Sequence, residues 1–253
     1  MVSAHDDFER DGYLVVRGVV PPADVAAFSE VFGTLVPDME YPRGPDGVIR
    51  ELTGLARQFP PLMQIALDRR FGALVARALG AARVQLLQDS LLYKPAHDGG
   101  SVEWHQDRTY IGYLEPANVA TLRIALLPED DDNGCMRVVP GSHRWGHAGE
   151  NQSLTATSVA SLLPQLTDEQ RAAVERARSL PLEPGDISIH HCLTLHGSPP
   201  NRSDRPRRTI LLRMFDGSCT LVPSKLPPGA EAFFATDANG QLAEAGFPIV
   251  YPR

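Results

Sequence analysis

The sequence contains few cysteines, and it has no long apolar run. Its 253 residues include three cysteines, Cys135, Cys192 and Cys219. An odd number without paired spacing argues against a disulfide framework and predicts reduced thiols. No apolar run approaches the roughly 18 residues that a membrane span requires. The first residues also lack the basic and apolar regions of a secretion signal. We therefore expect a cytoplasmic protein without a membrane segment.

Positive charge is scarce relative to negative charge. Lysine and arginine number 24 against 31 aspartates and glutamates, which gives a formal net charge of −7. This balance argues against nucleic acid or an anionic membrane as a partner, and it disfavours a large polyanionic substrate. The sequence also lacks the G-x-S-x-G elbow of hydrolases and the G-x-G-x-x-G loop of dinucleotide-binding enzymes. A small molecule is therefore the expected partner, whereas the oligomeric state has no signature in the sequence.

Apolar periodicity places helices mainly before residue 80 and strands after it. Helical spacing predicts one helix after Pro21 and a helical region from Pro60 to Leu79, with Gly80 as its C-cap. Strand-like segments follow at residues 84–94, 119–127, 135–139, 184–191, 194–198 and 208–215. This order predicts a mainly β fold, a jelly-roll (cupin-like) double-stranded β-helix buttressed by N-terminal helices.

One segment, at about residues 144–180, interrupts the β pattern. Thr167 and Gln170 have the spacing of a capping box, which predicts a helix that continues to about Ser179. The segment is too short to bury a core of its own. We therefore predict a single domain, 1–253, with a helical insertion or lid at about 144–180.

The sequence Trp104-His105-Gln106-Asp107 contains the chemistry that dominates the prediction. On an extended strand, residues i and i+2 point to the same side, so His105 and Asp107 can offer a nitrogen and an oxygen to one metal ion. A second imidazole from elsewhere would complete a 2-His-1-carboxylate set. Such a set leaves metal positions open, as a non-haem Fe(II) oxygenase requires.

Four blocks of sequence, in a fixed order, resemble the phytanoyl-CoA dioxygenase family, which also includes the ectoine hydroxylases. The blocks are Asp11 to Gly18; Lys94-Pro95 with Trp104 to Asp107; Asn133 to His143; and Pro184-Gly185-Asp186 with His196-Gly197-Ser198, Asn201 and Arg207. The resemblance implies a double-stranded β-helix that uses Fe(II), 2-oxoglutarate and O2. It further implies hydroxylation of an unactivated C–H bond, with release of succinate and CO2.

The resemblance also implies the iron ligands. His105 and Asp107 would supply two of them, and His196 fits the third position best because it precedes the family's Gly-Ser. His190 and His191 remain alternatives for that position. Asp107 also disfavours halogenation, because related halogenases have a small residue there.

The far carboxylate of 2-oxoglutarate needs a rigid cation, and arginine meets a carboxylate through two parallel hydrogen bonds. The family places this arginine eleven residues after the last iron ligand, which is Arg207 here, with Ser198 as a second contact. Arg208 is the rival, although neighbouring strand residues face opposite ways. Further expected contacts are Gln88 and Arg123 for the cosubstrate, and Ser90, Gln106, Trp104 and Tyr110 for the substrate.

Three questions stay open from the sequence alone. The chain could be a non-catalytic small-molecule-binding β-barrel of the same fold, or a Zn2+ hydrolase, although no general base for the latter is recognisable. The outcome could also be desaturation, epoxidation or rearrangement instead of hydroxylation. The substrate itself is expected to be a small metabolite of a specialised biosynthetic pathway.

Overall fold

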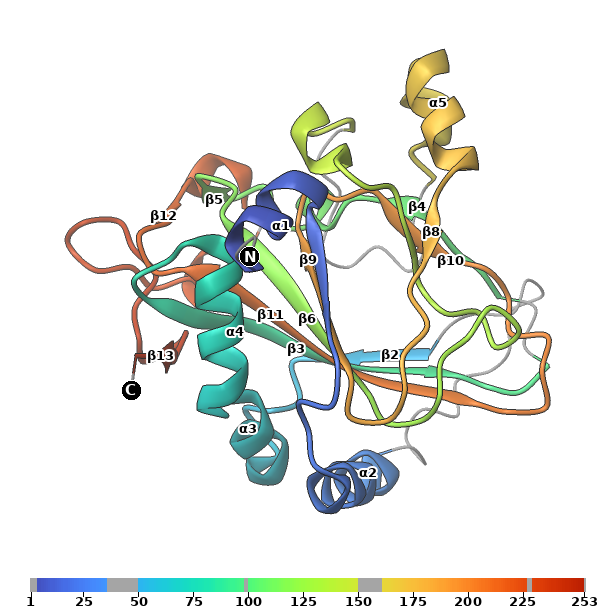
Figure 1. Ribbon diagram of the computed structural model, residues 1–253. Helices are drawn as coiled ribbons and strands as arrows, with labels where there is room; N and C mark the ends of the chain where they lie inside the picture. The colour runs from blue at the N-terminus through green and yellow to red at the C-terminus, as the bar shows by residue number, and fades with distance from the viewer. Residues whose placement is uncertain (1–3, 36–49, 98–99, 150–160, 227–228, 253) are drawn as a thin grey trace.

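Two antiparallel sheets form the body of the protein (Figure 1). The computed structural model describes residues 4–35, 50–97, 100–149, 161–226 and 229–252. The larger sheet runs in the order β1 (Tyr13–Val16), β9 (Ile187–His191), β6 (Val119–Ala125), β11 (Arg207–Asp216), β3 (Val84–Lys94) and β13 (Ile249–Tyr251), with β2 (Arg50–Thr53) also paired to β3. The smaller sheet runs β4 (Val102–His105), β10 (His196–Ser198), β7 (Arg137–Val138) and β8 (Arg178–Ser179). A short pair, β5 (Leu114–Glu115) and β12 (Thr220–Leu221), lies apart. The predicted mainly β, jelly-roll class is confirmed.

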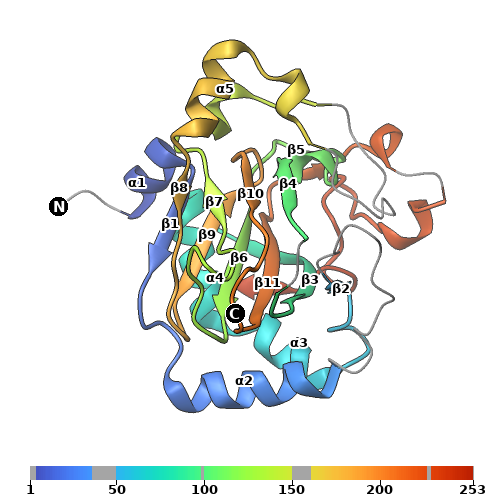
Figure 2. The ribbon, with the colours of Figure 1, turned by 90° about the vertical axis from the view of Figure 1, so that its right-hand side faces the viewer.

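Helices cover one face of the larger sheet. The first four are α1 (Ala4–Asp11), α2 (Pro22–Leu35), α3 (Pro60–Ala66) and α4 (Arg69–Leu79). Their apolar side chains, including Phe8, Phe32 and Phe71, share one buried cluster with Leu122 of β6 and Leu212 of β11. Figure 2 shows α2 beneath the sheets and α5 (Asp168–Glu175) at the opposite end of the molecule. The main hydrophobic core therefore lies between these helices and the outer face of the larger sheet.

The alternation of side chains along β11 separates that core from the interior between the sheets. Ile210, Leu212 and Met214 point to the helices and are fully buried among apolar neighbours. Residues of the other parity, Arg207 and Arg213 among them, point the opposite way because strand side chains alternate. The same ten-residue strand thus supplies both the apolar core and a polar interior.

Several predicted boundaries need correction. The predicted helical region 60–79 consists of two helices, since Asp68 caps α4 by accepting a hydrogen bond from the backbone of Arg70. The helix after the Thr167 cap ends at Glu175 instead of Ser179, because Arg178–Ser179 pairs with β7. Helix α1 was not expected. In the predicted insertion, residues 150–160 lie outside the described part of the chain.

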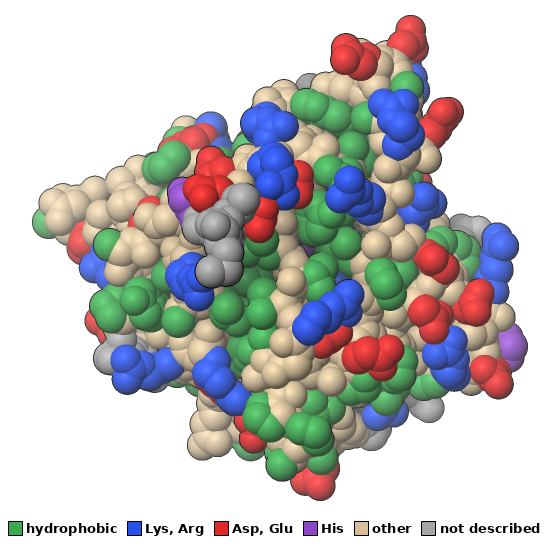
Figure 3. Space-filling model, viewed as in Figure 1, with side chains coloured by type: hydrophobic (Ala, Val, Ile, Leu, Met, Phe, Trp, Pro, Cys, Tyr) green, Lys and Arg blue, Asp and Glu red, His purple; other side chains and the backbone are tan. Residues whose placement is uncertain are grey.

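The surface has mixed charge on the face shown in Figure 3, where basic and acidic side chains lie scattered among hydrophobic ones. No helix within the described ranges combines the length and the apolar character that a bilayer crossing demands.

Gly185 precedes β9 in a turn that only glycine fits. It has a φ of +89°, and an added Cβ would lie 2.3 Å from the carbonyl oxygen of Val20. Gly18 has a similar φ of +60°, but no atom lies within 4 Å of an added Cβ. Positive φ alone costs an L-residue about 1–2 kcal/mol, and a backbone clash adds to that cost.

We therefore expect Gly185→Ala to lower the free energy of unfolding by roughly 3 kcal/mol or more. Gly18→Ala should lower it by only about 1 kcal/mol. Urea unfolding followed by circular dichroism measures both changes, and equal losses in the two variants would contradict the backbone contact at Val20.

Candidate metal centre and cosubstrate site

A row of polar side chains crosses four strands on the interior face of the larger sheet. Gln88 lies opposite Arg213, Arg213 opposite Thr121, and Thr121 opposite His190 in the antiparallel register. Directly opposed residues in an antiparallel pair share a face. Asp107 reaches this row, so the row forms the floor beneath the predicted metal ligands.

The two predicted histidine ligands come from adjacent strands of the smaller sheet. His105 ends β4 and lies directly opposite His196 of β10, with ring centroids 4.1 Å apart. Each Nδ1 lies within hydrogen-bond distance of a carbonyl two residues earlier, at 2.8 Å from Glu103 and 2.9 Å from Thr194. A carbonyl only accepts, so each Nδ1 carries the hydrogen and each Nε2 keeps its lone pair for a metal.

Asp107 begins a 3-10 helix, Asp107–Thr109, instead of continuing the strand. The extended backbone of Gln106 still turns His105 and Asp107 to the same side. Oδ1 of Asp107 lies 3.8 Å from Nε2 of both His105 and His196. The sequence argument therefore gave the right geometry, although only His105 belongs to the strand.

The other carboxylate oxygen of Asp107 is held by the floor. Oδ2 accepts hydrogen bonds from Thr121 Oγ1 at 2.5 Å and His190 Nε2 at 3.3 Å. Arg213 Nη2 lies 3.3 Å from Oδ1. Burial alone would raise the pKa of Asp107, but Arg213 and the neighbouring histidines hold it well below its usual value. The carboxylate is therefore ionised and oriented as a ligand must be.

These three residues fit a divalent metal. Their ligand atoms all lie within 4.8 Å of one another, and all three side chains are buried. Two imidazole nitrogens and one carboxylate oxygen match the donor set of non-haem iron sites.

His190 and His191, the alternatives for the third position, have other neighbours. His190 donates to Asp107 and so supports a ligand. His191 faces Phe8 and His143 instead, at centroid distances of 6.1 and 5.7 Å. Burial lowers the pKa of His191 to about 4, so it stays neutral inside the protein.

Arg207 lies at the far end of the interior, directly opposite Lys94. Both are fully buried. Arg207 donates to the carbonyl of Gly134, while its Nε has no hydrogen-bond partner among the described residues. Lys94 donates to Ser198 Oγ at 2.9 Å. Two buried cations and a hydroxyl thus lie where the sequence predicts that the far carboxylate of 2-oxoglutarate binds. Burial lowers the pKa of Arg207 to about 10.

The rival Arg208 points to the opposite face. Its guanidinium lies 5.7 Å from the ring centroid of Phe32 and 5.8 Å from that of Tyr93, among the helices. Strand alternation therefore separates the two arginines as expected.

Arg123 faces the interior, as predicted, but it already has a partner. Its Nη2 lies 2.8 Å from Glu129, and its Nη1 donates to Ser188. Thr209 donates to the other oxygen of Glu129 at 2.7 Å. Burial would raise the pKa of Glu129, whereas Arg123 and Arg207 hold it below its ordinary value. Arg123 is thus half of a buried ion pair next to the Arg207 site.

The predicted substrate contacts separate into two groups. Ser90 lies on the interior face, and the ring of Tyr110 is 6.4 Å from that of His105. Gln106 hydrogen-bonds the backbone of Gly146, Leu193 and Ala148, which ties residues 146–148 to the segment with His105 and Asp107; its contact with the substrate stays a prediction.

Trp104, which is also predicted at the substrate, packs against a small apolar cluster with Val139, Leu162, Leu166 and Leu195. These contacts are those of a core residue, and its role at the substrate stays a prediction.

Four residues at the site were not assigned a role from the sequence: Lys94, Thr121, Glu129 and Arg213. The sequence could have indicated two of them, because strand residues an even number of positions apart share a face. Arg213 therefore lies on the same face as Arg207, and Thr121 on the same face as Arg123.

Comparison with known proteins agrees with this geometry. The family model for phytanoyl-CoA dioxygenase (PhyH) matches residues 8–209. The chain belongs to the phytanoyl-CoA dioxygenase family. It is 29% identical over 224 residues to the ectoine dioxygenase of Sphingopyxis alaskensis, an alignment that covers 81% of this chain and 72% of that protein.

Solved structures of two enzymes from nogalamycin biosynthesis share the fold. The carbocyclase SnoK from nogalamycin biosynthesis superposes with a TM-score of 0.79 and 21% identity, over 98% of both chains. The epimerase SnoN, in complex with Fe3+ and alpha ketoglutarate, gives a TM-score of 0.74 and 22% identity over 96% of both chains. This PhyH protein is accordingly an iron- and 2-oxoglutarate-dependent dioxygenase.

The Arg123–Glu129 pair yields a stability prediction. We expect Glu129→Gln to cost roughly 3 kcal/mol of unfolding free energy, because it leaves a buried guanidinium unpaired. Since folding lowers the pKa of Glu129, the carboxylate stabilises the wild type above its ordinary value of 4.5, and this contribution is lost as the pH falls. The variant should therefore lose less stability on acidification.

A surface pair provides the control. Asp24 and Arg70 are both 40% exposed and 2.8 Å apart. Asp24→Asn should cost less than about 1 kcal/mol. Urea unfolding between pH 7 and pH 4 compares the two, and similar costs in both variants would refute the buried-pair interpretation.

Proposed function

We propose that this enzyme hydroxylates an unactivated C–H bond of a small molecule, with His105, Asp107 and His196 as the iron ligands. The convergence of these three ligand atoms supports the assignment most strongly, because each imidazole is already fixed in the tautomer that binds a metal. In the bound state, Fe(II) with 2-oxoglutarate and O2 supplies the oxidising chemistry and releases succinate and CO2.

The chain's own residues orient the reactants. Thr121 and His190 occupy Oδ2 of Asp107, which leaves Oδ1 directed toward the two histidines. Arg207, Ser198 and Lys94 would anchor the far carboxylate of 2-oxoglutarate, and their burial excludes the water that would otherwise weaken a charged hydrogen bond. Arg123 and Glu129 support this pocket from the side.

The comparisons support a small-molecule substrate. The relatives are an ectoine dioxygenase and, at lower identity, enzymes whose chemistry includes carbocyclisation and epimerisation of nogalamycin intermediates. Hydroxylation is proposed as the default outcome, and a role in a specialised biosynthetic pathway is consistent with these relatives. The intact ligand set argues against a non-catalytic barrel.

Succinate formation tests the assignment directly. Anaerobically Fe(II)-loaded protein with 2-oxoglutarate, exposed to O2, should form succinate even without the substrate, through slow uncoupled turnover. His196→Ala should abolish it, because one of three ligands is lost. The control His5→Ala alters an exposed histidine of α1 and should retain the wild-type rate. A wild type that binds neither Fe(II) nor 2-oxoglutarate in anaerobic titrations would refute the proposed function.

Arg207 gives a second test, on cosubstrate affinity. Arg207→Gln should raise the dissociation constant of 2-oxoglutarate about 100-fold, since it removes charge-assisted hydrogen bonds worth about 3 kcal/mol. Arg208→Gln removes the neighbouring charge on the opposite face and should leave the constant unchanged. Calorimetric titration of the Mn(II)-loaded proteins measures both. Equal effects would show that Arg207 acts through overall charge alone.

A further inference from the structure

Positive charge exceeds negative charge on the interior face of the larger sheet. Two acidic side chains, Asp107 and Glu129, meet four basic ones among the described residues at this face. The four basic residues are Lys94, Arg123, Arg207 and Arg213. The arginines stay charged at any physiological pH. The charge of Glu51 in β2 also acts on Arg213, but the Glu51 side chain is exposed, so water screens its charge.

The proposed cofactors do not remove this excess, because Fe(II) carries two positive charges and 2-oxoglutarate two negative ones. Arg123 has Glu129 as its own carboxylate. Arg207 and Lys94 face the far carboxylate of the cosubstrate in the proposed function. Among these described cations, Arg213 has Asp107 as its ion-pair partner, at 3.3 Å, and in the proposed function it shares that carboxylate with the metal.

The contacts of Arg213 leave it able to bind a ligand. Nη2 lies 3.3 Å from Asp107, Nη1 donates to Gln88 Oε1, and Nε has no hydrogen-bond partner in the described part of the chain. Gln88 is neutral, so it orients the guanidinium without compensating its charge. A buried cation in this position is costly unless an anion accompanies it.

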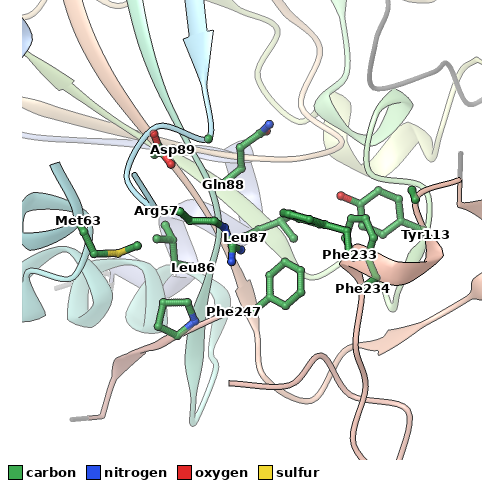
Figure 4. Close-up of a pocket in the computed structure, with 13 residues that line it drawn as sticks. Arg57, Met63, Leu86, Leu87, Gln88, Asp89, Tyr113, Phe233, Phe234 and Phe247 are labelled. Carbon is green, nitrogen blue, oxygen red and sulfur yellow. The ribbon is translucent and has the colours of Figure 1, made fainter. Parts of the chain in front are cut away.

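Gln88 also lines a cavity of about 250 Å3 (Figure 4). The figure shows aromatic rings of Tyr113, Phe233, Phe234 and Phe247 along one side of this cavity, with Arg57 between them and Met63. The cavity is thus apolar over much of its wall. The Gln88 amide points away from the aromatic rings in Figure 4 and hydrogen-bonds Arg213, which contacts the proposed metal ligand Asp107.

We propose that Arg213, oriented by Gln88, binds an anionic group of the substrate, and that the apolar part of the substrate lies against Phe233, Phe234 and Phe247. The substrate class is a small carboxylate with an apolar or aromatic body. This inference depends on the proposed function, because it assigns Asp107 to the metal. It also places the oxidised carbon close to the carboxylate, since Arg213 contacts a ligand of the iron.

A matched pair of probes tests the anion directly. Phenylacetate and phenylacetamide have the same shape and differ in charge. Calorimetric titration into anaerobic protein loaded with Mn(II) and saturated with 2-oxoglutarate gives both affinities without turnover. We expect the wild type to bind phenylacetate at least about tenfold more tightly, which corresponds to one charge-assisted hydrogen bond.

The variants locate the anion. Arg213→Gln should abolish the preference, whereas Arg57→Gln removes the other arginine of the cavity and should retain it. Arg208→Gln, on the opposite face of β11, is the control for lost charge. Arg213→Lys keeps the charge and should retain most of the preference, which separates binding from misfolding.

Each other outcome has a defined meaning. No preference in the wild type, or a preference that survives Arg213→Gln, would overturn the inference. Loss of the preference in Arg57→Gln alone would show that Arg57 binds the anion, and it would also overturn the inference. If Arg213→Gln instead weakens Mn(II) binding and keeps the probe preference, the arginine serves only Asp107. Failure of the wild type to bind Mn(II) and 2-oxoglutarate would refute the proposed function itself, before any probe is added.

Discussion

The orientation of one buried carboxylate determines how the rest of the site is built. Asp107 is the residue where the two sheets meet, because its Oδ1 faces histidines of the smaller sheet and its Oδ2 is held by Thr121 and His190 of the larger one. A buried carboxylate is stable only when hydrogen bonds and opposite charge replace its hydration. The need to satisfy Asp107 therefore explains the hydroxyl, the imidazole and the guanidinium that lie in one row beneath it.

That row is possible because the larger sheet has two faces of different character. Its outer face is covered by helices α1 to α4 and forms the main apolar core, which anchors the strands. The inner face can then hold polar and charged side chains at fixed positions without endangering the fold. Rigid strands on both sides of the metal set also explain why the ligand atoms already converge.

The sequence was sufficient for the fold class and for the approach of the three predicted metal ligands, but not for their surroundings. Strand β3 was predicted at its observed bounds, and His105, Asp107 and His196 come together as expected. These features depend on local patterns and on a family's ordered motifs. The hydrogen bonds of Gln106 could not be predicted because its three backbone partners are remote in sequence. Arg213 was missed because no motif includes it; its position six residues after Arg207 places it on the inner face, but only the structure shows its contact with Asp107.

The proposed metal site and the proposed substrate contacts lie largely in different parts of the chain. The family match ends at residue 209, and it includes the metal ligands and Arg207. Arg213, Phe233, Phe234 and Phe247 all lie beyond it, yet the C-terminal segment brings those aromatic rings into the cavity beside Gln88. Segments that pack against the end of a barrel are where binding residues commonly lie. The residues after 209 supply the aromatic wall of the cavity and Arg213, so the proposed substrate recognition depends on a part of the chain outside the family match.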